Sequence, residues 1–224
     1  DTAIFGVGSG AAGTITVGTV DVNAITFNAA GSGNYALSGG TITLGGTAPT
    51  ITTNVDASIA SALAGTLGMI KTGTGKLQLA GNNTGLTGGL TISQGSVQLN
   101  WINTGGTGTI TLGDTNTGAS NTSLIISDYR VTNAVTVANQ GTGTATISYT
   151  PASANFTLAL GAITLNRAAT FTAPSLAGYM YLDSAFSGSG TLTIGSTSAD
   201  RIILRGNNSG YTGDIVVKSS GVFE

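Results

Sequence analysis

The chain has 224 residues, of which 36 are glycine and only 7% are charged, and it contains neither histidine nor cysteine. These absences exclude a Ser-His-Asp triad, disulfides and thiol chemistry, and a formal charge of −2 gives no attraction to nucleic-acid phosphates. With 40% hydrophobic residues, the chain is too apolar for a disordered segment, because such segments are poor in branched apolar residues and rich in charge.

Glycine-rich turns and short alternating segments follow one another along the chain. The first turn, residues 8–13, matches a dinucleotide-binding fingerprint, but residues 14–17 continue as a strand where a phosphate-binding helix would have to begin. Alternation of apolar and polar residues then predicts strands of about four to six residues, for example at 42–44, 77–79, 110–112 and 192–194. Residues 56–64 also fit a short helix; we interpret them as irregular strand.

Two stretches of the sequence occur twice. Residues 81–92 correspond to 206–217 at an offset of 125, and residues 61–65 resemble 184–188 at an offset of 123. Stacked coils favour similar residues at equivalent positions, whereas a β-sandwich has no need to reuse a loop. We therefore predict an all-β chain forming a parallel β-helix, or β-solenoid, of about ten coils with roughly 20 to 25 residues each. Two continuous modules are expected, 1–100 and a diverged 101–224.

One stretch carries a family resemblance. Residues 71–84, continuing through 87–97, resemble the autotransporter-associated β-strand repeat; the second copy departs from it, with Asp214 in place of the second glycine of the Gly88-Gly89 pair. The resemblance implies a right-handed parallel β-helix in exported, surface-displayed bacterial proteins, where the repeat serves as stalk or passenger and not as a catalyst.

The most distinctive polar positions lie in the repeated turns. Asparagine tolerates left-handed backbone conformations and its amide bonds to neighbouring backbone, so we expect structural turn roles for Gly81, Asn82, Asn83, Gly206, Asn207 and Asn208. Aromatic faces stack on sugars or on partner proteins. Trp101, Tyr179 and Tyr181 are therefore candidates for a contact surface, with core filling as the alternative.

Catalytic and metal-binding groups are sparse. The chain has nine acidic residues spread along its length, and only Asp183 and Asp200 are placed to approach each other on neighbouring coils. Without His or Cys, a metal would need oxygen ligands, which Asp114 and Asn116 suggest for a single calcium ion, although turn capping is the more common role. We predict no catalytic, metal or cofactor-binding residues and no cofactor.

The predicted function is that of an extracellular or bacterial cell-surface structural β-solenoid, acting as a stalk, a surface-layer component or a filament-forming subunit. The alternative is an adhesin or carbohydrate-binding module of a surface-displayed passenger; a polysaccharide-cleaving enzyme is a distant third. The chain begins at Asp1 and ends within an apparent strand, so we expect a processed or excised segment that self-associates end to end or continues into a longer chain. A glycan or host surface is a possible partner, whereas nucleic acid is not, and no segment is long and apolar enough to span a membrane as a helix.

Overall fold

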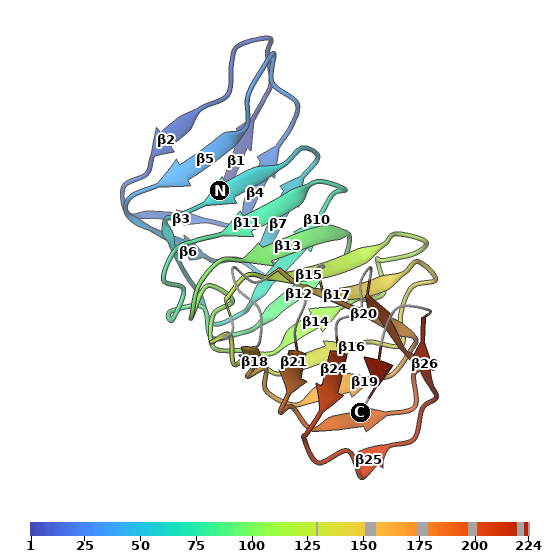
Figure 1. Ribbon diagram of the computed structural model, residues 1–224. Coiled ribbons are helices and arrows are strands. Elements are labelled where there is room, and N and C mark those ends of the chain that lie inside the picture. The colour runs from blue at the N-terminus through green and yellow to red at the C-terminus, as the bar shows by residue number, and fades with distance from the viewer. Residues whose placement is uncertain (129, 151–155, 174–178, 197–200, 219–221, 224) are drawn as a thin grey trace.

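The computed structural model is a β-solenoid in which every described strand pairs in parallel with strands of the neighbouring coils (Figure 1). The structure describes residues 1–128, 130–150, 156–173, 179–196, 201–218 and 222–223. The prediction of a parallel β-helix is confirmed. In particular, the ambiguous segment 56–64 is strand, as β8 (Ala57–Ile59) and β9 (Ala62–Ala64).

Two long sheets run the length of the stack, with ten strands each among the described residues. The first sheet contains β1 (Thr2–Phe5), β4 (Ala24–Phe27), β7 (Thr50–Thr53), β10 (Met69–Thr72), β12 (Leu90–Ile92), β14 (Ile110–Leu112), β16 (Val135–Val137), β19 (Ile163–Leu165), β22 (Phe186–Gly188) and β25 (Gly210–Tyr211). The second sheet contains β2 (Thr14–Thr16), β5 (Tyr35–Ser38), β8, β11 (Lys76–Leu79), β13 (Gly95–Leu99), β15 (Thr122–Ile126), β17 (Ala145–Tyr149), β20 (Ala169–Ala173), β23 (Leu192–Ser196) and β26 (Ile215–Val217).

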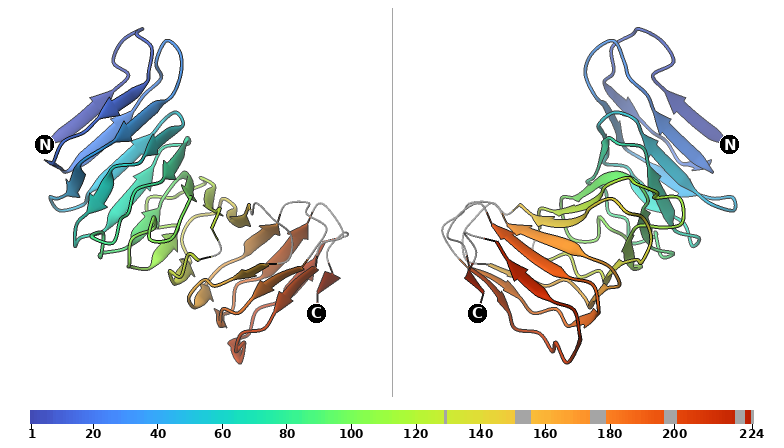
Figure 2. Two further views of the ribbon diagram at one scale, coloured as in Figure 1. Left: turned by 60° about the vertical axis from the view of Figure 1, so that its left-hand side comes forward. Right: turned by 90° about the vertical axis from the view of Figure 1, so that its right-hand side faces the viewer.

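Among the described residues, the third face of the solenoid carries strands only at its two ends. Near the N-terminus these are β3 (Val20–Val22), β6 (Thr41–Leu44) and β9; near the C-terminus they are β18 (Phe156–Leu158), β21 (Tyr179–Leu182), β24 (Arg201–Leu204) and β27 (Val222–Phe223). In the coils between them, loops follow β11, β13 and β15 where the third strand would stand. Figure 2 shows that the stack bends in this middle region.

Coil length varies more than the sequence predicts. Register partners lie 20 residues apart between Thr50 and Ile70, but 28 apart between Val135 and Ile163. Individual strands are two to five residues long, shorter than the expected four to six, because the corners between faces take up a larger share of each coil.

The core is built from ladders of apolar residues at matching positions in successive coils. One ladder in the first sheet consists of the paired residues Leu90, Ile110, Val135, Ile163 and Phe186, all at most 1% exposed. Burying each such side chain contributes roughly 1.5–3 kcal/mol. Because alternate residues of a strand point to opposite faces, the apolar member of each alternating pair goes inside, as the sequence pattern predicts.

Lys71 breaks this apolar pattern, because its side chain points inward from β10 and is 0% exposed. Its ammonium donates to the carbonyl oxygens of Thr72 and Gly73 at 2.8 Å each and of Gln94 at 3.0 Å. Burial lowers the pKa of Lys71 to about 7, and the nearby Asp56 carboxylate partly opposes that shift. The three carbonyls match the three donors of an ammonium, so Lys71 joins the corner after β10 to the next coil.

Candidate functional site

The middle of the third face is covered by three loops, each following a strand of the second sheet. They span residues 80–89, 100–109 and 127–134, the last without residue 129, which lies outside the described residues. Since β11, β13 and β15 pair in register, these loops start at stacked positions; the amide of Ser127, for example, donates to the carbonyl of Leu99. We call this surface the loop face.

Buried amides connect the loops to one another and to the coil before them. The Asn83 side chain is 0% exposed, accepts from the Leu63 amide at 2.7 Å and donates to the Thr104 carbonyl at 2.6 Å. In the third loop, Asn133 donates to the carbonyls of Gly106 and Gly108 in the second loop, at 3.1 and 2.8 Å. Buried amides with satisfied hydrogen bonds make a loop rigid. The loop face is therefore a braced surface.

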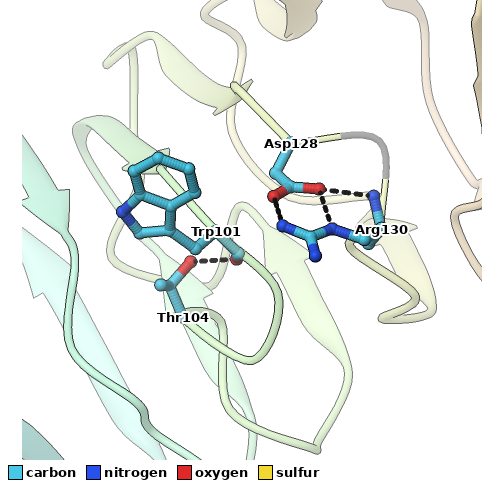
Figure 3. Close-up of polar contacts among 4 residues, drawn as sticks. All are labelled: Trp101, Thr104, Asp128 and Arg130. Carbon is cyan, nitrogen blue, oxygen red and sulfur yellow. Dashed lines mark hydrogen bonds and ion pairs between the residues drawn. The ribbon is translucent and has the colours of Figure 1, made fainter.

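Trp101 stands on this braced surface with its side chain largely in solvent. It is 58% exposed and the following residue, Ile102, is 44% exposed. Its backbone is held from within the loop, because the Thr104 hydroxyl donates to the Trp101 carbonyl at 2.8 Å, as Figure 3 shows. The exposed position shows that Trp101 does not fill the core; its role in a contact surface stays a prediction.

An ion pair lies in the loop next to that of Trp101 (Figure 3). The guanidinium of Arg130 binds Asp128 through Nε to Oδ1 at 2.9 Å and through Nη2 to Oδ2 at 2.5 Å, and the Arg130 amide also donates to Oδ1 at 2.8 Å. The hydrogen bonds from Arg130 lower the pKa of Asp128, although burial opposes them. The side chain of Asp128 is 7% exposed and that of Arg130 48%. The loop face thus combines an exposed aromatic ring with a half-exposed cation.

The other aromatic candidates lie on β21, among the C-terminal strands of the same third face. Alternation is as expected for residues 181–182, since Leu182 is buried and Tyr181 is only partly buried. The Tyr181 ring is covered by the guanidinium of Arg205, 4.3 Å from the ring centroid, and Arg205 also pairs with Asp183 at 2.7 Å. The side chain of Tyr179 lies outside the described residues. Tyr181 thus lies on the same third face as Trp101 but in a later coil, and its ring is covered by Arg205.

Comparison with known proteins gives one clear similarity. The chain is 52% identical over 86 residues to the Adhesin BmaC autotransporter of Brucella suis biovar 1 (strain 1330). The predicted resemblance to autotransporter repeats is confirmed. The matched residues are 38% of this chain but 2% of that protein, so the chain spans only a small part of the relative's length. No family model matches the chain, and no solved structure matches it.

The two copies of the repeated turn make equivalent hydrogen bonds. Asn82 accepts from the amide of Thr84, and Asn207 accepts from that of Ser209. Asn83 accepts from the preceding coil at Leu63, and Asn208 does so at Phe186 with a distance of 3.1 Å.

The glycines that open these turns stand against the backbone of the preceding coil. A Cβ added at Gly81 would lie 2.2 Å from the Ser61 carbonyl oxygen, and one at Gly206 would lie 1.9 Å from that of Ser184. All the recorded bonds of the paired asparagines are internal to the fold.

The candidates for metal and acid–base chemistry are occupied in other ways. Asp114 Oδ1 accepts from Ser93 Oγ, from the Asn116 amide and from Thr117 Oγ1, which is the pattern of a capped turn. Asp183 pairs with Arg205, and Asp200 lies outside the described residues. Within the described part of the chain, no three acidic, His or Cys residues gather as a metal site, and no helix is long and apolar enough to cross a bilayer.

Sequence reasoning missed several residues that build the loop face. Asn133, Thr104 and the Asp128–Arg130 pair lie in loops without a repeated pattern. Asn133 and the Thr104 carbonyl also have partners in other coils, which no local pattern shows. The Asp-x-Arg spacing at 128–130 is a local signal that could have been found, because an Asx-type turn brings residues two apart within hydrogen-bonding reach.

Proposed function

We propose that this chain is part of a surface-displayed adhesive passenger, in which the solenoid holds the loop face toward a binding partner. The observation that carries the proposal is Trp101, an exposed indole on a loop braced from below through Asn83 and Thr104. Large aromatic and arginine side chains dominate binding energy at contact surfaces, and a rigid support lowers the entropy lost on binding.

The similarity to a protein named as an autotransporter adhesin supports the same role. In this proposal the chain works outside the cell or at a bacterial cell surface, and its contribution is contact without catalysis. Its near-neutral, weakly charged composition favours recognition through aromatic and hydrogen-bonding groups over long-range electrostatic steering.

The test is adhesion of beads coated with the purified chain to cultured epithelial cell monolayers. We expect Trp101→Ala to reduce bead retention at least about tenfold, since truncating an aromatic hot spot costs about 2 kcal/mol or more. Trp101→Phe keeps an aromatic face and should retain most of the adhesion. Because the side chain is exposed, Trp101→Ala should leave the midpoint of urea unfolding unchanged.

A matched control is Val7→Ser, which removes a side chain that is 84% exposed in the first coil, away from the loop face. It should adhere like the unaltered chain. If Trp101→Ala and Val7→Ser adhere equally well, or if the unaltered chain does not adhere at all, the proposed role of the loop face is wrong.

The stalk, filament or surface-layer role is the second candidate. It is favoured by the two ten-stranded sheets that run through all the described coils without a break, because such a stack is a stiff spacer. Electron microscopy together with analytical ultracentrifugation separates the possibilities: fibres or ordered sheets support self-assembly, whereas single short rods at all concentrations support a spacer within a longer chain.

A further inference from the structure

A groove with a volume of about 380 Å³ lies at the corner where the first sheet leads into the second, above β17 and β20. Its walls come from two neighbouring turns of unequal length, residues 138–144 before β17 and residues 166–168 before β20. The longer turn projects beyond the shorter one, and the groove lies in the space between them. This corner is distinct from the loop face, which follows the second sheet.

Arg167 is the cation of this groove and all of its recorded acceptors are neutral. Its Nε donates to the Ala138 carbonyl at 3.1 Å, its Nη1 to the Gly143 carbonyl at 2.6 Å, and its Nη2 lies 3.5 Å from the Thr122 hydroxyl. No carboxylate is among the residues that line the groove. A guanidinium has five N–H donors, so these contacts leave donors and a positive charge for an incoming anion.

Arg167 keeps its positive charge in this groove, since a guanidinium is not deprotonated in proteins. Burial lowers the pKa of Arg167 from its usual value, which is the effect of placing a charge near protein without an opposite charge. A half-buried charge is stabilised when a counterion binds beside it. The three neutral contacts meanwhile fix the guanidinium in place, so it does not have to be ordered when a ligand arrives.

The rest of the lining points to a hydroxyl-rich ligand. Threonine hydroxyls surround the groove, from Thr142 and Thr144 on the longer turn to Thr170 and Thr193 on the second sheet, with glycine and alanine between them. Thr170 and Thr193 are register partners on neighbouring strands. Hydroxyls both donate and accept, as sugar hydroxyls do, whereas an apolar side chain of a peptide would find no aromatic or branched aliphatic wall here.

We propose that this groove binds an acidic monosaccharide unit of a glycan, with the sugar carboxylate on Arg167 and the sugar hydroxyls on the surrounding threonines. The volume is at the lower end of that of small-ligand sites and exceeds what a single inorganic anion needs. The assignment is independent of Trp101 and goes beyond the adhesive role proposed for the loop face, because it names a second site and a ligand class for it.

The experiment is a titration of the whole chain with methyl glucuronide and with the methyl glycoside of N-acetylneuraminic acid, followed by NMR chemical-shift changes. We expect at least one of them to bind in the millimolar range and to shift amides of residues 141–144 and 167–170. Methyl glucoside, which lacks the carboxylate, should bind at least about tenfold more weakly, as the loss of a charge-assisted hydrogen bond predicts. Inorganic phosphate should not compete at equal concentration.

Two variants keep the proposal open to contradiction. Arg167→Gln should weaken binding about tenfold or more. The paired substitution Thr170→Val with Thr193→Val removes two hydroxyls from the groove and leaves Arg167 and its carbonyl contacts intact. This second variant therefore tests the groove even if Arg167→Gln lowers stability. Trp101→Ala should bind the acidic sugar normally, which separates this site from the loop face. The proposal is overturned if neither acidic sugar binds, if the threonine pair has no effect, or if phosphate binds equally well.

Discussion

The turn at residues 81–86 and the turn at 206–211 are copies of one another that lie on different faces of the solenoid. Each has the same local bonds, from the amide of Leu86 to the carbonyl of Asn83 and from that of Tyr211 to Asn208. The first copy nevertheless leads into β12 of the first sheet, whereas the second leads through β25 into β26 of the second sheet.

The difference shows what the repeat encodes. Leu86 bridges to Gly65, and Tyr211 pairs with Gly188, so each turn stacks directly on the other repeated stretch, 61–65 or 184–188. The unit that recurs is therefore a pair of stacked corners in two successive coils. Its position around the solenoid is not part of the unit, because the coils between the copies differ in length.

The sharpest test of this comparison is the alanine substitution of the buried asparagine in each copy. Asn83→Ala leaves the Leu63 amide and the Thr104 carbonyl without partners and should lower the free energy of unfolding by about 3 kcal/mol. The side chain of Asn208 is only partly buried and has one recorded bond, from the Phe186 amide, so Asn208→Ala should cost about 1 kcal/mol. Urea unfolding followed by circular dichroism measures both.

The exposed neighbours provide the control for that experiment. Asn82→Ala and Asn207→Ala each remove one Asx-turn bond at the surface, and both should change stability by about 0.5 kcal/mol or less. Equal costs for Asn83→Ala and Asn208→Ala would mean that burial does not distinguish the two copies.

A second difference between the copies is the buried ammonium of Lys71, which lies just before the first copy. The position 125 residues later, just before the second copy, is Ser196. With a folded pKa of about 7 and an ordinary value of 10.5, the unfolded chain binds more protons between these values, so stability rises with pH there. The gain should be about 2 kcal/mol from pH 7 to pH 9. Urea midpoints at four pH values measure it.

The matching variant is Lys71→Met, which keeps the length of the side chain and removes the titrating group. Its stability should not change between pH 7 and pH 9, whatever its absolute value. A rise with pH that persists in Lys71→Met would assign the effect to another group.

A smaller effect than that of Lys71 is expected at the residue that differs at the centre of the turn. Tyr211 donates its hydroxyl toward the carbonyls of Gly190 and Asp214 at 2.6 and 3.0 Å, whereas Leu86 fills the equivalent place with a fully buried apolar side chain. Tyr211→Phe should therefore cost about 1 kcal/mol, measured by urea unfolding. The control in the other copy is Leu86→Met, a volume-conserving change that should cost no more than about 1 kcal/mol. A Tyr211→Phe variant as stable as the unaltered chain would contradict the role of the hydroxyl.

The sequence predicts what depends on local pattern. Alternation at Leu77 and Leu79 predicts β11, and the repeated Asn pairs locate both copies of the turn. It does not predict the loss of the third strand after β13, or that Asn133 braces a loop 25 residues earlier, because these depend on which coils stack. For the same reason the exposure of Trp101 and the groove around Arg167 are visible only in the folded chain.

The corner between the first and second sheets takes up very different lengths of chain while the strands on both sides keep their register. It spans residues 93–94 in one coil, 113–121 in the next and 138–144 in the one after, yet Leu90, Ile110 and Val135 remain stacked. Insertions and deletions at this corner are therefore absorbed without disturbing the core. Evolution or protein engineering can therefore change the loops at this corner, and with them the exposed surface, while the stacked strands of the solenoid stay the same.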